Sequence, residues 1–136
     1  MTIKTTIQLP RTLVNQLLHL AQQSPDQEVC GLIGRRADRC VCYPIDNVAT
    51  DASVLFALNA SEQIAAIKQM HDKGQELFAI YHSHPSSPAL PSATDIEDAD
   101  YPDALYLIVS LNTRGVLEMR GFYLRDQEID EVNLSI

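Results

Sequence analysis

Hydrophobic and polar residues alternate along some segments of the chain and recur at helical spacing along others. Residues 2–9 alternate in the way typical of a half-buried strand. Over residues 10–23, apolar side chains recur every three or four positions, which predicts an amphipathic helix. A hairpin-type turn is expected at residues 112–115. Short apolar runs bounded by turn residues predict further strands at residues 28–34, 40–45, 54–58, 77–84, 104–111, 116–125 and 129–136.

Two further helices are predicted between these strands. The longer one begins at Asn59 or Ser61, either of which can cap it, and ends before Gly74, which suits the position just past a helix end. Its expected buried stripe consists of Ile64, Ile67 and Met70. A short acidic helix is expected at residues 94–99. The elements together predict an α/β fold, with a mixed central β-sheet, two main helices and a short third, in a single domain over residues 1–136.

The composition indicates where this domain acts and which partners it avoids. The 136 residues include 18 acidic and 10 basic side chains, and the formal net charge of −8 argues against non-specific binding to nucleic acid or to anionic membranes. No apolar run is long enough to span a membrane, and the amino terminus lacks the apolar core of a signal peptide. Three cysteines without an export signal indicate reduced thiols in the cytoplasm.

Two histidines end the strand predicted at residues 77–84. Side chains two apart on a strand point to one face, so His82 and His84 can converge while the serine between them faces away. Pro85 turns the chain, and the ten residues that follow His84 are enough to bring Asp95 back over the imidazoles. Two imidazoles and one carboxylate leave one position of a four-coordinate zinc shell open. The sequence therefore predicts one zinc ion per chain, held by His82, His84 and Asp95, with a bound water.

Two further residues are assigned to catalysis. A zinc-bound water needs a base that takes its proton and later returns it to the leaving amine. Glu28 is the candidate, because it stands at the start of an apolar strand, where partial desolvation raises the pKa of a carboxyl group. Ser92 lies close to the site through Asp95 and can donate a hydrogen bond to the oxyanion of the tetrahedral intermediate.

Each of these features also has a purely structural interpretation. Ser92 and Asp95 fit a capping box at the start of the short helix, and Ser92 can be cap and donor in different states. Histidines two apart on a strand can form a solvated or hydrogen-bonded pair. Glu28 can be an exposed loop acid that follows the first helix. Their conjunction favours the metal site, because an ordinary loop requires neither a second histidine in register nor a carboxylate at the helix start.

The order and spacing of these residues resemble a known signature. Glu28, followed at a distance by His82-Ser83-His84-Pro85 and then by Ser92 and Asp95, is similar to the signature of the JAMM or MPN-plus (Mov34/PAD-1-type) zinc metalloproteases. The segment 28–34 resembles the region around the catalytic glutamate of that family. The resemblance covers most of the chain, and five functional positions match in type, order and spacing.

The resemblance implies a cytidine-deaminase-like α/β sandwich of the JAMM/MPN type. His82, His84 and Asp95 would be the zinc ligands. Glu28 would be the general acid and base, and Ser92 would stabilise the transition state. The implied reaction is hydrolysis of a peptide or isopeptide bond, often after the glycine-rich tail of a ubiquitin-like protein.

The likeness is to the compact bacterial members of that family. The chain has no evident insertions of the kind with which eukaryotic members hold a second ubiquitin. It therefore resembles members that process ubiquitin-like sulfur-carrier proteins by cutting after a C-terminal Gly-Gly end. The partner that the resemblance implies is the C-terminal tail of such a carrier.

Three other functions are alternatives at this point. A non-catalytic module could bind a ubiquitin-like tail without cutting it. A cysteine peptidase could use Cys30 with a histidine, but a cysteine inside an apolar run without a nearby cation is a poor thiolate. A relative linked to DNA repair shares the histidine pattern, and the acidic balance counts against it. Cys40 and Cys42 are expected on one strand face as small core side chains.

Overall fold

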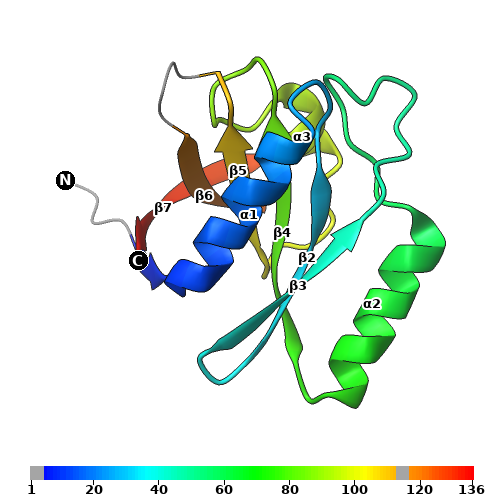
Figure 1. Ribbon diagram of the computed structural model, residues 1–136. Coiled ribbons are helices and arrows are strands. Elements are labelled where there is room, and N and C mark those ends of the chain that lie inside the picture. The colour runs from blue at the N-terminus through cyan, green and yellow to red at the C-terminus, as the bar shows by residue number, and fades with distance from the viewer. Residues whose placement is uncertain (1–4, 113–116) are drawn as a thin grey trace.

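The computed structural model of the chain describes residues 5–112 and 117–136 (Figure 1). Its elements, in chain order, are β1 (Thr6–Gln8), α1 (Arg11–Gln23), β2 (Cys30–Arg36), β3 (Arg39–Ile45), α2 (Ala60–Asp72), β4 (Glu76–His84), α3 (Ala93–Glu97), β5 (Leu105–Ser110), β6 (Glu118–Arg125) and β7 (Glu128–Ser135). Within the described ranges, seven strands form one sheet in the order β1-β7-β6-β5-β4-β2-β3. The β1–β7 and β4–β5 pairs are parallel and the other neighbours are antiparallel. The predicted mixed sheet with two main helices and a short third is confirmed.

Helices pack on both faces of the sheet (Figure 1). The apolar stripe of α1, which includes Leu13 and Leu17, packs on one face in a core that contains Tyr81. Helix α2 packs on the other face, where Met70 belongs to a core that contains Ile80. Since Ile80 and Tyr81 are consecutive residues of β4, this central strand is buried on both of its faces. The two histidines at its carboxyl end, His82 and His84, therefore stand on a rigid support.

Two glycines of β2, Gly31 and Gly34, lie at a close backbone approach and at a β-bulge. A Cβ atom on Gly31 would lie 2.5 Å from the carbonyl oxygen of Tyr43 and 2.5 Å from the hydroxyl of Tyr81. The pairing of β2 with β4 shifts its register between Ile33 and Gly34. Glycine at position 31 thus allows β3 and the Tyr81 ring to approach β2.

The prediction of a strand at residues 54–58 is wrong. This segment runs as turns and irregular backbone, and it contributes one isolated bridge, between Leu58 and Asn47. The Asn47 side chain accepts a hydrogen bond from the Ala57 amide and donates one to the Leu55 carbonyl, in place of strand partners. The apolar residues of this segment therefore form a loop that lies against the site described below.

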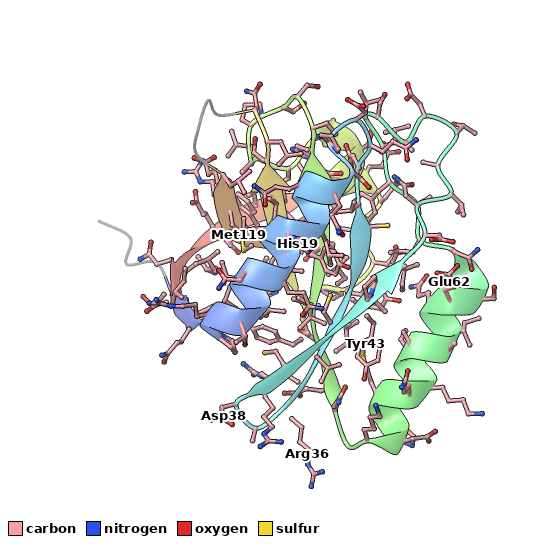
Figure 2. All side chains as sticks on the ribbon, in the orientation of Figure 1. His19, Arg36, Asp38, Tyr43, Glu62 and Met119 are labelled. Atoms are coloured by element: carbon pink, nitrogen blue, oxygen red, sulfur yellow. The ribbon has the colours of Figure 1, made fainter. Side chains whose placement is uncertain are left out.

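The buried stripe predicted for α2 is also wrong in two of its three positions. Met70 is buried, but Ile64 and Ile67 are 69% and 38% exposed, and Ala66 takes the other buried position. At about 100° per residue, Ile64 lies about 200° around the helix from Ala66, so the two side chains point to nearly opposite sides of α2. Figure 2 shows Tyr43 between β3 and α2, and its ring packs against the core to which Ala66 belongs.

The remaining predictions on local structure are mostly met. Helix α3 begins one residue earlier than expected and ends at Glu97. Cys40 and Cys42 are half-buried against the core below α1, and both are free thiols, as is the buried Cys30. The turn expected at residues 112–115 falls largely on residues outside the described ranges. No helix among the described residues is long and apolar enough to cross a membrane.

Candidate metal centre

The two histidines of β4 and the aspartate of α3 converge on one point. His82 and His84 lie on the same face at the carboxyl end of β4, and their exposed fractions are 1% and 3%. Their Nε2 atoms are 3.1 Å apart. The Oδ2 atom of Asp95 lies 3.1 Å from Nε2 of His82 and 3.2 Å from Nε2 of His84. Three potential ligand atoms thus form a nearly equilateral triangle.

The dimensions of this triangle fit a metal ion. Tetrahedral zinc with bonds of about 2.0–2.1 Å places its ligand atoms about 3.3–3.4 Å apart, a few tenths of an ångström more than the observed separations. Two imidazoles and a carboxylate are also ligand types that zinc accepts. The donor set of His82, His84 and Asp95 therefore fits the predicted metal in both chemistry and size.

A second hydrogen bond orients the His84 ring toward this point. Its Nδ1 donates to the carbonyl oxygen of Pro88 at 2.8 Å, so a neutral ring carries its lone pair on Nε2, which faces the triangle. Burial alone would lower the pKa of His84, but hydrogen bonds to Asp95 and to the Pro88 carbonyl outweigh burial and raise it. The proline-containing loop after β4 thus has a specific task, because it supplies the carbonyl that fixes this ring.

His82 is held in a different way. The Phe56 ring stacks on the His82 ring, with the centroids 4.3 Å apart and the planes inclined by 20°. Its Nδ1 atom is buried and has no hydrogen-bond partner among the described residues. Burial is the largest influence on this ring, and it lowers the pKa of His82. A neutral imidazole is the form that binds a metal.

Asp95 is placed by the start of α3. Ser92 and Asp95 form a reciprocal capping box: the Asp95 amide donates to the Ser92 hydroxyl at 3.0 Å, and the Ser92 amide donates to Oδ2 of Asp95 at 2.9 Å. Burial opposes ionisation of Asp95, but hydrogen bonds from His82 and His84 outweigh it and hold the pKa of Asp95 well below its usual range. The structural interpretation of Ser92 as a cap is therefore correct. Because the hydroxyl accepts this bond, it still has its own proton to donate.

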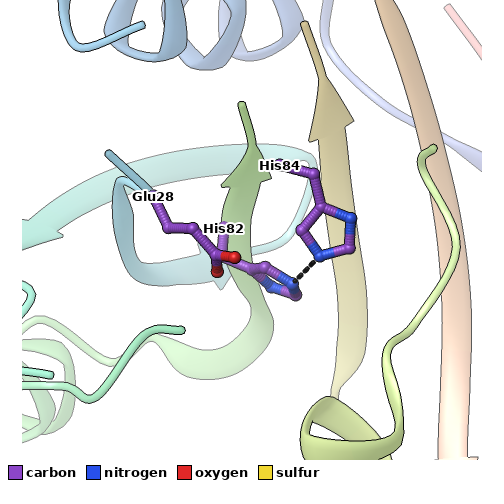
Figure 3. A group of neighbouring side chains, drawn as sticks. All are labelled: Glu28, His82 and His84. Carbon is purple, nitrogen blue, oxygen red and sulfur yellow. Dashed lines mark hydrogen bonds between the residues drawn. The ribbon is translucent and has the colours of Figure 1, made fainter. Parts of the chain in front are cut away.

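Glu28 is not an exposed loop acid but a buried carboxyl beside the histidines. Its exposed fraction is 4%, and its Oε1 has no hydrogen-bond partner among the described residues. Ligand atoms of Glu28, His82 and His84 lie within 4.8 Å of one another, and Figure 3 shows the Glu28 carboxyl beside the His82 ring. Burial raises the pKa of Glu28 to about 7; the His84 charge lowers it and the Asp95 charge raises it. This carboxyl can exchange a proton near neutral pH.

Ser83, which was expected to face away from the metal, holds the backbone next to Glu28. Its hydroxyl accepts a hydrogen bond from the Val29 amide at 2.9 Å, and its own amide donates to the Val29 carbonyl at 3.0 Å. The side chain replaces a backbone acceptor at the point where the β2–β4 ladder ends. The His82-Ser83-His84 segment therefore presents the two histidines on one face and fixes the strand that carries Glu28 with the residue between them.

Asn47, in the segment between β3 and α2, was not singled out by the sequence. Its Nδ2 donates to the carbonyls of Glu28 and Leu55, both at 2.9 Å, and its Oδ1 accepts from the amides of Ala49 and Ala57, both at 3.0 Å. Leu55 and Ala57 flank Phe56, the residue that stacks on His82. Asn47 thus ties the backbone of Glu28 to the loop segment that supports His82. No pattern in a single sequence distinguishes such an asparagine from an ordinary turn residue.

Replacing Asn47 with alanine is expected to lower kcat by about tenfold to hundredfold, since it loosens two groups at the reacting centre. It should also lower the free energy of unfolding by about 2 kcal/mol, because buried backbone groups lose their partners. The matched control is Asn59→Ala, which removes the N-terminal cap of α2 and costs about 1 kcal/mol without touching this loop. Kinetics and urea denaturation of both variants are the measurements. Equal losses of kcat in the two variants would contradict a positioning role for Asn47.

Cys30 does not fit the role of a nucleophile. Its thiol is 2% exposed and lies 3.4 Å from the carbonyl oxygen of Ile45, to which it donates. Burial, followed by the negative charges of Glu28, Asp46 and Glu62, raises the pKa of Cys30 to about 12. The thiolate that a cysteine peptidase needs is therefore strongly disfavoured at neutral pH.

Comparison with known proteins identifies relatives over most of the chain. The family model of prokaryotic homologs of the JAB domain (Prok-JAB) matches residues 10–122. A desampylase of Haloferax volcanii is 35% identical over 97 residues, which cover 69% of this chain and 70% of that protein. The CysO-cysteine peptidase of Mycobacterium tuberculosis is 30% identical over 129 residues, which cover 91% of this chain and 86% of that protein.

A solved structure agrees with these relatives. The solution structure of a protein from Desulfitobacterium hafniense matches with a TM-score of 0.81 and 31% identity, covering 93% of this chain and 90% of that chain. The resemblance predicted from the signature residues, and the fold class that it implied, are confirmed. The expectation of a peptidase agrees with the name of the mycobacterial relative. The chain belongs to the family of prokaryotic homologs of the JAB domain.

Proposed function

We propose that this protein is a zinc-dependent peptidase or isopeptidase that hydrolyses the bond after the Gly-Gly-like C-terminal tail of a ubiquitin-like protein of the sulfur-carrier type. The observation that carries the proposal is the convergence of His82, His84 and Asp95 beside a buried carboxyl, Glu28, whose pKa is about 7. A metal site with an adjacent proton-exchanging group is the minimum equipment of a hydrolytic zinc enzyme.

We assign the metal to His82, His84 and Asp95, at one zinc per chain, although Glu28 also lies near both histidines. A carboxylate that binds a metal must be ionised. The pKa of Asp95 is far below neutrality, and its Oδ2 is within 3.2 Å of both imidazole nitrogens. The pKa of Glu28 is about 7, which suits a group that gains and loses a proton. When bound, zinc supplies the Lewis acidity that makes water nucleophilic near neutral pH.

The chain's own residues perform the proton transfers and hold the oxyanion. Glu28 takes the proton of the attacking water at its unpaired Oε1 and then delivers it to the leaving amine. The low exposure of Glu28 keeps bulk water from competing for this proton. Ser92 donates its hydroxyl proton to the oxyanion that develops on the scissile carbonyl, while its oxygen still accepts the Asp95 amide.

The substrate class is proposed by similarity. The relative named CysO-cysteine peptidase covers 91% of this chain, and the other relative is named a desampylase. We infer a ubiquitin-like partner with an extended tail, because a flexible tail can reach a metal centre at the edge of a sheet more readily than a folded segment can. The three free thiols suit a cytoplasmic protein, and the net charge of −8 favours a protein partner over a nucleic acid.

Intact-mass spectrometry tests this function. Candidate ubiquitin-like carriers that extend beyond Gly-Gly are incubated with the zinc-loaded protein, and we expect a mass loss equal to the extension. A chelator should abolish the loss, and iodoacetamide should leave it intact, because Cys30 is a buried thiol. A carrier that binds without any change of mass would instead identify a non-catalytic binding module. Chelator-insensitive cleavage blocked by iodoacetamide would return Cys30 to consideration.

A further inference from the structure

A hollow with a volume of about 220 Å³ adjoins the metal centre on the face of the sheet that α2 covers. Its floor is formed by buried side chains of β4 and β5, Ile80 and Tyr106, and its walls by the half-buried rings of Phe56 and Tyr101. The exposed carboxylates of Asp98 and Asp100 line it as well. The hollow is therefore aromatic and apolar inside and acidic at its rim.

The position of this hollow next to the reacting centre follows from one contact and two spacings along the chain. The Phe56 ring that lines it stacks on His82, with centroids 4.3 Å apart. Ile80 precedes His82 by two residues in β4, so both side chains point to the same face. Asp98 follows Asp95 by three residues, about one helical turn, at the end of α3. One side chain, Phe56, separates the hollow from a metal-ligand ring.

The walls are fixed by hydrogen bonds within the protein. The Tyr101 hydroxyl accepts from Nε2 of Gln63 at 2.6 Å, and the Tyr106 hydroxyl accepts from the Tyr101 amide at 3.2 Å. In the described part of the chain, Asp98 and Asp100 take part in no ion pair. The rings are thus preorganised, whereas the two carboxylates have their charge available for a ligand.

A cationic side chain with a long apolar stem matches this combination. The methylene groups of lysine or arginine pack along aromatic rings, and the charged end then lies between carboxylates at the rim. In the proposed reaction the two residues directly before the scissile bond are glycines, which have no side chain. The side chain nearest to the metal centre is therefore the one directly after the scissile bond, which belongs to the leaving group.

We propose that the hollow formed by Phe56, Ile80, Tyr101 and Tyr106, with Asp98 and Asp100 at its rim, is a subsite for a lysine or arginine side chain of the group released after the Gly-Gly tail. This inference rests on the proposed function and adds to it a preference for basic leaving groups. It accounts for acidic residues at the end of α3 that the metal centre does not use.

The test compares leaving groups that differ in charge at nearly constant shape. Three versions of one ubiquitin-like carrier carry Lys, Met or Glu directly after Gly-Gly, and kcat/KM is measured with the zinc-loaded protein. We expect Lys to exceed Met by about tenfold and Glu to be the poorest, in line with a cation held by rings and partly screened carboxylates. In Asp98→Asn and Asp100→Asn, the preference for Lys over Met should fall by about threefold each.

The control is Asp103→Asn, which removes the same charge from an exposed aspartate that does not line the hollow. It should leave the Lys-to-Met ratio unchanged. Equal rates for Lys and Met, or an equal effect of all three aspartate substitutions, would overturn the subsite.

Failure of the proposed function has a separate outcome. If none of the three carriers is cut, the free peptide Lys-Ala-Ser is titrated into the wild-type protein and the Asp98→Asn/Asp100→Asn double variant, with binding followed by calorimetry. Binding that the double variant weakens by about tenfold supports the subsite without turnover. Binding that is absent, or equal in both proteins, overturns it.

Discussion

Glu28→Gln is expected to lower kcat by about 10²- to 10⁴-fold while the protein keeps its zinc, because glutamine cannot take or return a proton. Its amide has nearly the size of the carboxyl, so the buried position beside His82 is filled in the same way. Wild-type kcat/KM should fall at acidic pH as Glu28 becomes protonated; the pKa of Glu28 is about 7 in the metal-free protein, and the charge of bound zinc moves this limb to lower pH. That acidic limb should be absent from the residual rate of the variant.

The same substitution should make the metal-free protein more stable at high pH. The pKa of Glu28 is raised from 4.5 to about 7 by burial, so its favourable contribution to folding is fully present below pH 4.5 and is lost as the pH rises through 7. Above that pH the ionised buried carboxyl costs about 3 kcal/mol, which Glu28→Gln removes. Urea denaturation at pH 8 and pH 4 measures the difference. The control is Glu97→Gln, which changes an exposed carboxylate. If the stability of Glu28→Gln equalled that of wild type at both pH values, the assigned pKa of Glu28 would be contradicted.

Asp95→Asn and His82→Ala are each expected to abolish zinc binding, and activity with it. Either change removes one of three atoms that lie 3.1–3.2 Å apart, and a neutral amide is a poor substitute for a carboxylate ligand. Metal analysis after gel filtration should find about one zinc per wild-type chain and none in the variants. Glu97→Gln, on the same helix as Asp95, should retain the metal.

Chelation gives a second measure of the same site. With free zinc at a hundredfold excess over its dissociation constant, the metal adds about 2.7 kcal/mol to the free energy of unfolding of the wild-type protein. EDTA should remove this increment from wild type and have no effect on Asp95→Asn. The comparison with Glu28→Gln then decides between the two carboxylates. Loss of zinc from Glu28→Gln and retention by Asp95→Asn would exchange the roles proposed for them.

The catalytic arrangement has an energetic cost that the fold compensates. A buried carboxyl with an unpaired oxygen, and a buried histidine whose Nδ1 has no partner among the described residues, are both unfavourable in a protein interior. They are held by a central strand that is buried on both faces and by the hydrogen bonds of Asn47 and Ser83. Unsatisfied groups at a rigid position are typical of sites that acquire their partners from a ligand.

The convergence of His82, His84 and Asp95 could be predicted from the sequence because their geometry is local. Side chains two residues apart on a strand point to the same face, so His82 and His84 share a face whatever the strand packs against. The serine and aspartate three residues apart mark a helix start by their own hydrogen bonds, which the capping box of α3 reproduces. The alternation and helical spacing of apolar residues likewise predicted most strands and the stripe of α1.

The incorrect predictions concern segments whose partners are distant in sequence. Residues 54–58 have the composition of a strand, but two of their backbone groups, the Leu55 carbonyl and the Ala57 amide, hydrogen-bond to the side chain of Asn47. The isoleucines of α2 have helical spacing, yet the helix turns Ala66 toward a core against which Tyr43 of β3 packs. Periodicity describes one element at a time, whereas burial depends on what two elements leave between them.

The sequence by itself determined the family, the α/β elements and the residues proposed as metal ligands, because these depend on residue type and on spacing within single elements. The tertiary structure alone decided that Glu28 is buried beside His82 and His84, that Phe56 backs the His82 ring and that Asn47 joins them. Each of these relations links residues that are far apart along the chain. Their side chains meet only when β2, β4 and the loop before α2 have packed together, and packing of that kind is not encoded in any local pattern.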